Sequence, residues 1–259
     1  MPISVVINTY NAERHLAEVL ETVKDFDEVL ICDMESTDST REIALRYGCR
    51  IVTFENKNYN IVEPAREFAI HQATHEWVLV VDADELIPPS LKDYLYKKIE
   101  APDCPDALLV ARKNHMMGCF MRSSYPDYQL RFFRKEKTHW PPIIHARPQV
   151  DGTIGSIPKQ LEECAMVHKS ETMSNAFRHV NEYTDNEVKR RKGTHVTWAK
   201  LIFQPFFRFF KGYIMKGGFR YGKVGYIQAC KHAYYKFVVL CKLLEQERMQ
   251  QQANKKQTP

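Results

Sequence analysis

Strand-like and helix-like segments alternate over the first hundred residues, and this alternation constrains the fold more than any other feature of the chain. Apolar segments rich in Val and Ile predict strands at 3–8, 28–32, 50–54 and 77–81. Segments with helical spacing or helix-start signals follow each of them, at 13–23, 36–47, 63–74 and 88–99. A β-α-β-α order of this kind predicts a parallel sheet with helices on both faces. We therefore expect an α/β fold with a Rossmann-like, mostly parallel sheet.

The predicted strand at 77–81 leads directly into Asp82-Ala83-Asp84-Glu85. Open α/β sheets bind their ligands beyond the carboxyl ends of the strands. Two carboxylates one residue apart repel each other unless a cation or water reaches both. An oxygen-only pair suits Mg²⁺ or Mn²⁺ together with a substrate phosphate. The alternative is an acidic surface turn, because turns are commonly rich in Asp.

Two earlier strands of the predicted sheet also end in polar residues. The first leads into Thr9-Tyr10-Asn11, and the second leads into Asp33. An acidic residue at the end of the second strand is well placed to accept a hydrogen bond from a ribose hydroxyl or a base NH. The glycine patterns of dinucleotide-binding folds and of P-loop NTPases are absent from the sequence. Three polar strand ends at one edge therefore indicate a different kind of nucleotide site.

Taken in order and at their spacings, these motifs resemble the family 2 glycosyltransferases of the GT-A fold, and within them the lipopolysaccharide-core glucosyltransferase branch. The resemblance rests on 4–11, Asp33 with 36–38, 77–85, 126–134 and the basic, aromatic tail. It implies an inverting, metal-dependent enzyme that transfers a hexose from a nucleotide sugar to a cell-envelope glycolipid such as the lipopolysaccharide core. Glucose is the expected hexose, and a UDP-sugar is the expected donor.

The resemblance also implies roles for individual residues at the nucleotide. Thr9, Tyr10 and Asn11 would line the nucleotide pocket, Asp33 would contact the base or the ribose, and Asp82 would face the ribose. Many family members carry a second Asp after the position of Asp33, which reads uracil. Met34 stands there in this chain, so the identity of the base stays open.

The diphosphate and the metal would be held by a second group of residues. The resemblance places Arg66 near the donor diphosphate and assigns Asp84 and His168 as ligands of an Mg²⁺ or Mn²⁺ ion. The alternative for Arg66 is a solvated helix face, and the alternative for His168 is a structural role.

The resemblance also points to Asp127 as the candidate catalytic base. It lies in Pro126-Asp127-Tyr128-Gln129-Leu130-Arg131, in a region similar to the family's catalytic Asp region. The alternative is a loop carboxylate paired with Arg131 or Arg134. Relatives in this branch often show His-Glu where this chain has His145-Ala146, and other candidates for the base are Asp151, Glu162 and Glu163.

Charge divides the chain into two predicted domains, a GT-A domain at 1–188 and a helical extension at 189–259. The extension holds 11 Lys and 5 Arg against two Glu, a balance of +14, whereas 1–188 carries −9. Its basic and aromatic segments are typical of an interfacial region on an anionic membrane leaflet. They are too short in uncharged apolar sequence to span a bilayer. The alternative is a helical pair packed on the domain, and we expect the last dozen residues to be disordered.

We expect a protein without a nucleic-acid partner, because the aromatic residues of the tail are massed in apolar clusters. We expect no secretory signal, and the seven cysteines contain no Cys-x-x-Cys. These features predict a cytoplasmic protein, peripheral on the inner face of the membrane. Met34 and Ala146 leave a second hypothesis, a non-catalytic membrane-surface binding protein on a degenerate GT-A scaffold. A nucleotidyltransferase is disfavoured because no Gly-rich basic loop follows the first strand.

Overall fold

The computed structural model describes residues 1–55, 62–141, 147–169, 173–191 and 193–257. They form two compact units, one of Met1–Asn114 and Ser124–Lys169, the other of His115–Ser123 and Ser170–Pro259. The predicted boundary between 188 and 189 lies inside helix α5 (Met173–Arg190). Because Val188 is buried with residues of the C-terminal helices, all of α5 belongs to the second unit.

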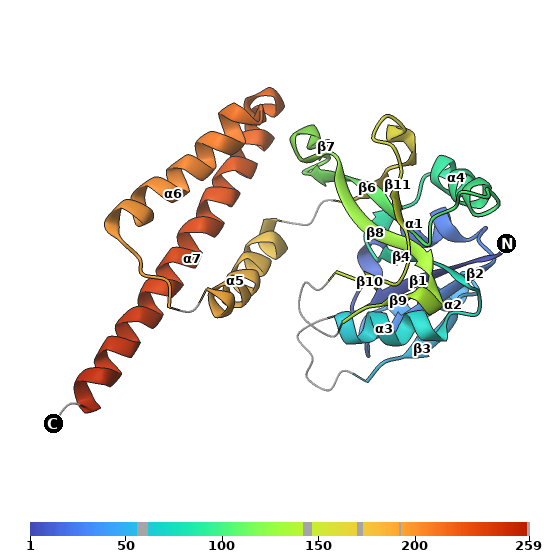
Figure 1. Ribbon diagram of the computed structural model, residues 1–259, viewed down its shortest axis with the longest axis horizontal. Coiled ribbons are helices and arrows are strands. Elements are labelled where there is room, and N and C mark those ends of the chain that lie inside the picture. Colours follow the sequence, from blue (N-terminus) through green and yellow to red (C-terminus); the bar gives the residue numbers. More distant parts are fainter. Residues whose placement is uncertain (56–61, 142–146, 170–172, 192, 258–259) are drawn as a thin grey trace. The chain divides into compact units, whose positions relative to one another are not determined.

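The first half of the first unit alternates strands and parallel crossovers as the sequence predicts (Figure 1). The strands are β1 (Ile3–Thr9), β2 (Glu28–Asp33), β3 (Arg50–Thr53) and β4 (Trp77–Asp82), and the helices are α1 (Glu13–Val23), α2 (Thr40–Arg46), α3 (Glu63–Gln72) and α4 (Pro89–Ile99). Strand β1 lies between β2 and β4 and is parallel to both, and β3 pairs in parallel with β2. The predicted α/β fold with its mostly parallel first half is confirmed.

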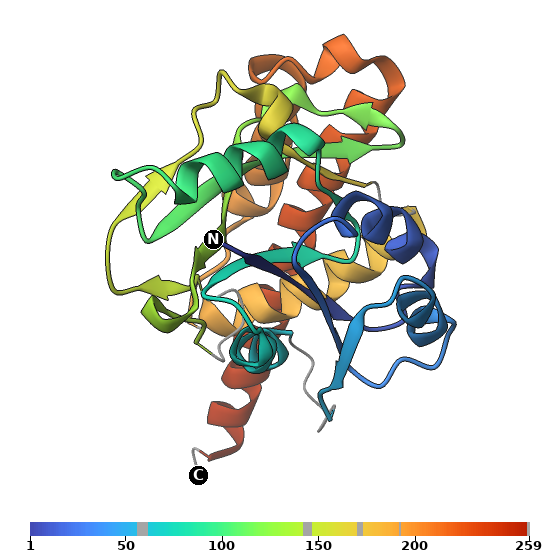
Figure 2. The ribbon, with the colours of Figure 1, turned by 90° about the vertical axis from the view of Figure 1, so that its right-hand side faces the viewer.

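Helices cover both faces of this sheet (Figures 1 and 2). Successive residues of a strand point to opposite faces, so Val5 and Val6 of β1 enter different cores. The core around Val5 contains buried side chains of α1, α2 and α4, and the core around Val6 contains those of α3. Burial on both faces explains why β1 and β4 read as continuous apolar segments.

The second half of the sheet is mixed. Its order continues from β4 through β8 (Asp127–Arg134), β6 (Ala107–Met116) and β12 (Met166–His168) to β5 (Glu85–Leu86). Strand β8 is antiparallel to both β4 and β6, whereas β12 is parallel to β6. Two short strands, β7 (Cys119–Phe120) and β11 (Ile154–Ser156), also pair with β6, and β9 (Thr138–His139) pairs with β10 (Gln149–Val150). The antiparallel run of β8 brings its first residue to the edge where β4 ends.

The second unit is built mainly from helices. After α5 come α6 (Trp198–Phe210), a π-helical turn at Lys211–Met215, a 3₁₀ turn at Gly218–Tyr221 and α7 (Gly222–Gln257). Helix α7 extends into the last dozen residues, where the sequence predicted disorder, because the Arg, Met, Gln, Ala and Lys residues there are good helix formers. Among the described residues, no helix combines the length and the apolar character needed to cross a membrane.

Candidate active site

The carboxyl ends of the parallel strands and the adjoining antiparallel strand bring most of the predicted site residues to one edge of the sheet. The register places Asn8 beside Asp82 and Thr9 beside Asp33. On the other side of β4, Asp127 begins β8. The edge therefore carries residues from the N-terminal strands and from the mixed half of the sheet together.

Asp84 and His168 meet at this edge. Their Oδ2 and Nε2 atoms are 3.3 Å apart, and the backbone N–H of Lys169 donates to the carbonyl of Asp84 at 2.9 Å. The other ring nitrogen of His168, Nδ1, lies 2.9 Å from Oδ1 of Asn114. Burial acts against the charged imidazolium, but the hydrogen bond and the charge of Asp84 outweigh it and raise the pKa of His168.

This pair fits a divalent cation. Its donor set is one carboxylate oxygen and one imidazole nitrogen, and both side chains are partly exposed, Asp84 at 33% and His168 at 25%. Contact with Asn114 orients the His168 ring, as second partners of metal-binding histidines commonly do. Within the described part of the chain, no cluster of three or more His, Cys, Asp or Glu forms a complete metal site. An ion held here would need oxygen ligands from a substrate phosphate, which is the usual arrangement for Mg²⁺.

Asp82 is held by two guanidinium groups. Its Oδ1 lies 2.5 Å from Nη2 of Arg66, and its Oδ2 accepts from Nη2 of Arg131. Burial disfavours the charged carboxylate, but Arg131 and Arg66 outweigh it and lower the pKa of Asp82 far below its usual range. Asp82 therefore fixes the positions of both arginines as a permanent anion, and its predicted contact with the ribose stays a prediction.

Arg66 is part of this edge and is not on a solvated helix face. Its side chain is 16% exposed, and its guanidinium lies 5.0 Å from the ring centroid of Trp140. Its Nε atom is buried, and the described residues supply no hydrogen-bond partner for it. The group is thus placed as a rigid cation near Asp82, as a role at the donor diphosphate requires.

Behind Asp82 lies an ion pair that the sequence did not predict. Glu85 has no exposed side-chain surface, and its Oε1 lies 3.0 Å from Nη2 of Arg131 and 3.1 Å from Nη1 of Arg112. Its Oε2 accepts from the backbone N–H of Asp82 at 3.0 Å. Glu85 therefore neutralises two arginines and holds the turn that carries Asp82 and Asp84. No local signal distinguished it from a surface acid, because its partners lie on other strands.

Asp127 receives hydrogen bonds on both oxygens. Its Oδ2 accepts from Nη2 of Arg112 at 2.8 Å and from Nδ2 of Asn114 at 2.9 Å, and its Oδ1 accepts from Nε2 of Gln129 at 2.9 Å. Burial opposes ionisation, but the hydrogen bond from Asn114 and the charge of Arg112 prevail and lower the pKa of Asp127. The alternative pairing with Arg131 or Arg134 does not occur, because Arg112 faces Asp127 across the β6–β8 register.

Asp33 and Thr9 lie beneath the surface of the nucleotide edge. Asp33 is fully buried and accepts from Thr9 Oγ1 at 3.1 Å, from Arg41 Nη1 at 3.1 Å and from the backbone N–H of Ser36 at 3.2 Å. It therefore orders the loop after β2 and offers no surface to a nucleotide in this conformation. Its direct contact with a base or ribose stays a prediction.

Tyr10 and Asn11 are the accessible part of the first motif. Tyr10 is 56% exposed, and Asn11 adopts a left-handed φ of 49°. Oδ1 of Asn11 accepts from the backbone N–H of Thr37 at 2.8 Å, and Oγ of Ser36 accepts from the backbone N–H of Asn11 at 2.9 Å. The two strand-end loops are thus tied together by side-chain to backbone hydrogen bonds.

The other candidates for the base lie elsewhere or outside the described residues. Asp151 is exposed, and its backbone N–H bonds to Lys137 near the end of β8 that is opposite Asp127. Glu162 lies 3.7 Å from Lys113, and Glu163 is exposed beside α4. The substitution at 145–146 falls outside the described residues.

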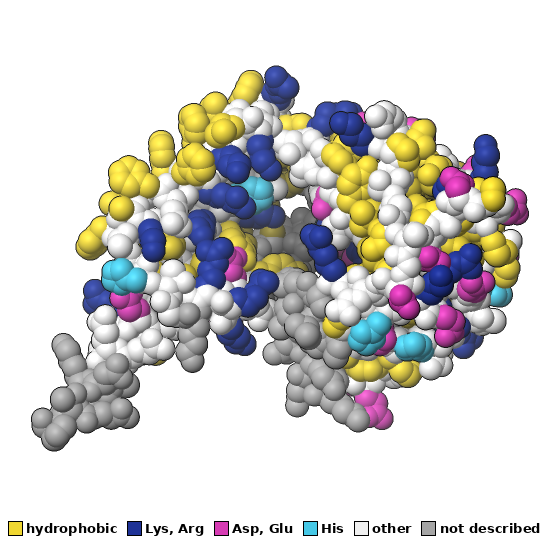
Figure 3. All heavy atoms as spheres, in the orientation of Figure 1, with side chains coloured by type: hydrophobic (Ala, Val, Ile, Leu, Met, Phe, Trp, Pro, Cys, Tyr) yellow, Lys and Arg dark blue, Asp and Glu magenta, His cyan; other side chains and the backbone are white. Residues whose placement is uncertain are grey.

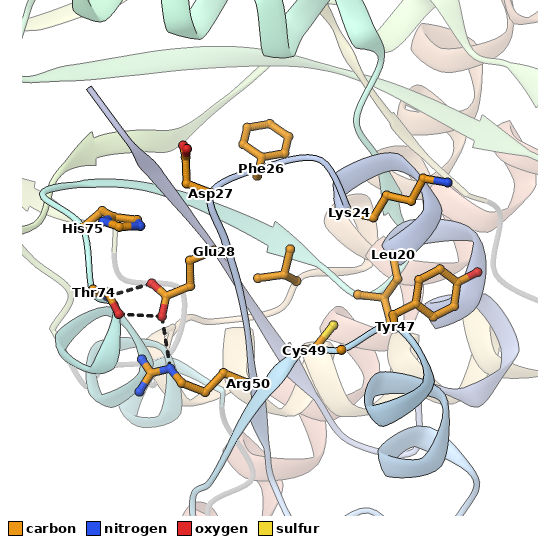
Figure 4. Close-up of a pocket in the computed structure, with 12 residues that line it drawn as sticks. Leu20, Lys24, Phe26, Asp27, Glu28, Tyr47, Cys49, Arg50, Thr74 and His75 are labelled. Atoms are coloured by element: carbon orange, nitrogen blue, oxygen red, sulfur yellow. Dashed lines mark hydrogen bonds and ion pairs between the residues drawn. The ribbon is translucent and has the colours of Figure 1, made fainter.

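A cavity of about 480 Å³ in the first unit lies at the opposite edge of the sheet (Figure 4). Its lining includes Glu28 and Arg50, which begin β2 and β3, and Thr74, which precedes β4. Both oxygens of Glu28 are bonded to Thr74, and Oε1 is also paired with Arg50, as Figure 4 shows. The cavity therefore contains none of the acidic strand ends and is separate from the candidate site.

Comparisons with known proteins identify the family of the chain. The family model for glycosyl transferase family 2 matches residues 4–150, more than half of the 259-residue chain. The lipopolysaccharide core biosynthesis glycosyltransferase LpsC of Rhizobium meliloti is 24% identical over 265 residues, which cover 98% of this chain and 96% of that protein.

Solved structures show the same fold. The crystal structure of S. aureus TarS 1–349 in complex with UDP matches with a TM-score of 0.51 at 18% identity, over 98% of this chain and 92% of that chain. A longer S. aureus TarS structure also gives a TM-score of 0.51, at 17% identity, and the match covers 86% of this chain and 46% of that one. This chain thus spans about half of the longer TarS.

Proposed function

The chain belongs to glycosyltransferase family 2, and on that basis we propose that it transfers a hexose from a UDP-sugar to a glycolipid of the cell envelope. It is a nucleotide-sugar-dependent transferase with a GT-A-like fold. The observation that carries the proposal is the convergence of Asp84 and His168, 3.3 Å apart, beside the Asp82–Arg66 pair. A metal-binding pair next to a fixed cation is what a sugar diphosphate requires.

UDP is supported as the nucleotide by the structural relative that binds it. The lipopolysaccharide core as the acceptor is supported by the full-length similarity to LpsC. Glucose as the sugar is supported by the resemblance of the sequence motifs to the glucosyltransferase branch of the family. The family resemblance supports inversion at the anomeric carbon. Each of these finer assignments is part of the proposal.

The site residues divide the chemistry between them. Asp84 and His168 would hold Mg²⁺ or Mn²⁺, which when bound offsets the charge that grows on the leaving diphosphate. Arg66, fixed by Asp82, donates to phosphate oxygens from its exposed side. Tyr10 and Asn11 line the nucleotide on the other side of the strand ends.

Asp127 is the proposed base for the acceptor. The acceptor hydroxyl oxygen forms a bond to the anomeric carbon as the bond from that carbon to the diphosphate breaks, and the proton passes to Asp127. The lowered pKa of Asp127 keeps it ionised at neutral pH, and its Oδ1 accepts one hydrogen bond, from Gln129, which leaves a lone pair for the proton. Such a weak base takes the proton late, when the attacking oxygen has become acidic.

The membrane is the proposed location of the acceptor. Helix α6 exposes Trp198, Ile202, Phe206 and Phe210 in a unit that carries most of the basic excess of the chain. Aromatic and basic side chains together suit the headgroup region of an anionic leaflet. We place the protein at the inner face of the cytoplasmic membrane as a peripheral enzyme.

The proposal is tested with Asp84→Asn, with Asp93→Asn as the matched control on the exposed face of α4. We expect a thermal shift with UDP-glucose and Mn²⁺ for the native protein and for Asp93→Asn, and none for Asp84→Asn. Transfer falls by at least about 100-fold in Asp84→Asn and after chelation.

Asp127→Asn lowers kcat by about 10²–10⁴-fold while the nucleotide-induced thermal shift is kept.

Three outcomes would each overturn a part of the proposal. Full transfer by Asp84→Asn in the presence of a chelator contradicts the metal site. GDP-, dTDP- or CDP-sugars that shift the melting temperature where UDP-glucose does not would replace UDP as the nucleotide. Vesicle binding without any response to a nucleotide sugar would favour the non-catalytic membrane protein.

A further inference from the structure

The second unit contains a cavity of about 550 Å³ that lies among its three long helices. It is lined by Glu187 and Arg191 of α5, Phe203, Gln204, Phe207 and Arg208 of α6, and Tyr235 and Lys236 of α7. All of these residues belong to one compact unit. The volume is within the range of small-molecule sites in proteins.

The cavity carries an uncompensated positive charge. Glu187 is the only acid in its lining, and both of its oxygens are used, by Nη2 of Arg191 at 2.8 Å and by the hydroxyl of Tyr235 at 2.7 Å. Among the side chains that the structure describes, no carboxylate pairs with Arg208 or Lys236. Arg208 and Lys236 therefore lack a direct ion-pair partner among these side chains, and the charge of Glu187 acts on Lys236 without such a contact.

The surroundings strengthen this positive potential. No Asp or Glu occurs between residues 189 and 244, which contain α6 and most of α7. The pKa of Lys236 is lowered, first by burial and then by the charge of Arg191, which Arg208 reinforces. A bound anion would relieve the repulsion between these three cations.

The wall beside the two cations is aromatic. Phe203 and Phe207 are one helical turn apart on α6, and they are 65% and 56% exposed. Figure 3 shows that hydrophobic side chains form a continuous ridge over α6 and that Lys and Arg side chains run alongside it. An occupant that satisfies both features has an anionic head and an apolar chain.

We propose that this cavity binds one anionic lipid molecule, with its phosphate at Arg208 and Lys236 and its acyl chain against Phe203 and Phe207. This inference rests on the proposed membrane-surface role of the second unit and adds to it a discrete site. The lipid is held by charge-assisted hydrogen bonds at the head, and apolar contact along α6 supplies the rest of the affinity.

The test uses the full chain and dihexanoyl phosphatidic acid below its critical micelle concentration, so that single lipid molecules are measured. Isothermal titration calorimetry should give a stoichiometry of one. Arg208→Gln/Lys236→Gln should weaken binding at least about tenfold, because each lost charge-assisted hydrogen bond contributes measurably to affinity. The matched control, Lys216→Gln/Lys223→Gln, removes the same charge from exposed positions outside the cavity and should stay within about threefold.

A second pair of variants tests the apolar wall. Phe207→Ala should weaken binding at least about fivefold, whereas Phe237→Ala, at an exposed position of α7 outside the lining, should leave it within about twofold. Dihexanoyl phosphatidylcholine and inorganic phosphate should each bind at least about tenfold more weakly than the phosphatidic acid.

Three results would overturn the inference: equal losses in the cavity and control variants, inorganic phosphate binding as tightly as the lipid, or no binding by the native protein. The thermal shift with UDP-glucose and Mn²⁺ is measured on every variant. If UDP-glucose and Mn²⁺ still shift the melting temperature but the lipid does not bind, only the lipid site is contradicted. If the lipid binds but UDP-glucose and Mn²⁺ give no shift, only the proposed transferase chemistry is contradicted.

Discussion

Glu85 is a buried carboxylate between two arginine side chains, and it connects the acidic turn to the rest of the candidate site. It contacts Arg131 and Arg112, and these reach Asp82 and Asp127 respectively. Charge therefore alternates along a continuous chain of contacts from the metal side of the edge to the proposed base. This chain gives Asp82 and Asp127 fixed positions before any substrate binds.

Glu85→Gln should destabilise the protein by about 3 kcal/mol. The substitution removes one of the carboxylates that neutralise Arg131, whose side chain is only 5% exposed. Urea denaturation followed by tryptophan fluorescence measures the change. Glu100→Gln, at an exposed position after α4, should alter the free energy of unfolding by less than about 0.5 kcal/mol. Equal stability of the two variants would show that Glu85 does not hold the network.

Asp127 gives the stability of the protein a defined pH dependence. Its pKa is lower in the folded protein than in the unfolded chain, where it is near the ordinary value of about 3.9. Its pairing therefore contributes stability above that value, and the contribution is lost as the pH falls through the lower folded-state pKa. The stability difference between the native protein and Asp127→Asn should narrow from about pH 5 to about pH 2 in urea titrations. A difference that is constant over this range would contradict the pairing.

At the scale of elements, the corner between α6 and α7 depends on close backbone contact. A Cβ atom added at Gly225 would lie 1.8 Å from the carbonyl oxygen of Gly218. A Cβ atom at Gly212 would meet only Ala229, at an ordinary distance of 3.7 Å. Gly212 therefore has room for a methyl group, whereas Gly225 does not. The difference arises from the close backbone approach at Gly225.

Gly225→Ala should destabilise the second unit by about 2–3 kcal/mol, because backbone must move to admit the methyl group. Gly212→Ala, with no close contact, should change stability by less than about 0.5 kcal/mol. Hydrogen exchange of the α6 and α7 amides measures both variants. Unchanged protection in Gly225→Ala would show that the helices do not approach as described.

The bounds of some strands and helices were predicted well from the sequence, whereas others were predicted incompletely. Strands β1 and β4 and helix α1 were predicted almost to the residue, because burial on one or both faces imposes a regular apolar pattern. Strand β6 extends over Ala107–Met116, but its second half is polar and gives no strand signal in the sequence. Residues such as Arg112 and Asn114 interrupt the apolar alternation from which a strand is predicted.

At the scale of the whole molecule, the chain combines an acidic sheet-forming part with a basic helical part. Residues 1–188 carry −9 and residues 189–259 carry +14. The acidic edge of the first unit holds the pairs that suit a metal and a diphosphate, and the basic second unit holds a cavity that suits an anionic lipid. Both proposed ligands are anionic. The proposed diphosphate site combines Arg66 with a carboxylate that requires a cation, whereas the proposed lipid site uses arginine and lysine alone.

The sequence by itself determined the α/β class, the parallel order of the first strands, the family and the edge at which Thr9, Asp33, Asp82 and Asp84 lie. These follow from local periodicity and from the rule that parallel strands end at one edge. The tertiary structure alone decided that Glu85 lies between Arg131 and Arg112, that Asp127 pairs with Arg112, and that Asp33 is buried. Such contacts join residues from distant strands, and the register that brings them together depends on the packing of the entire sheet.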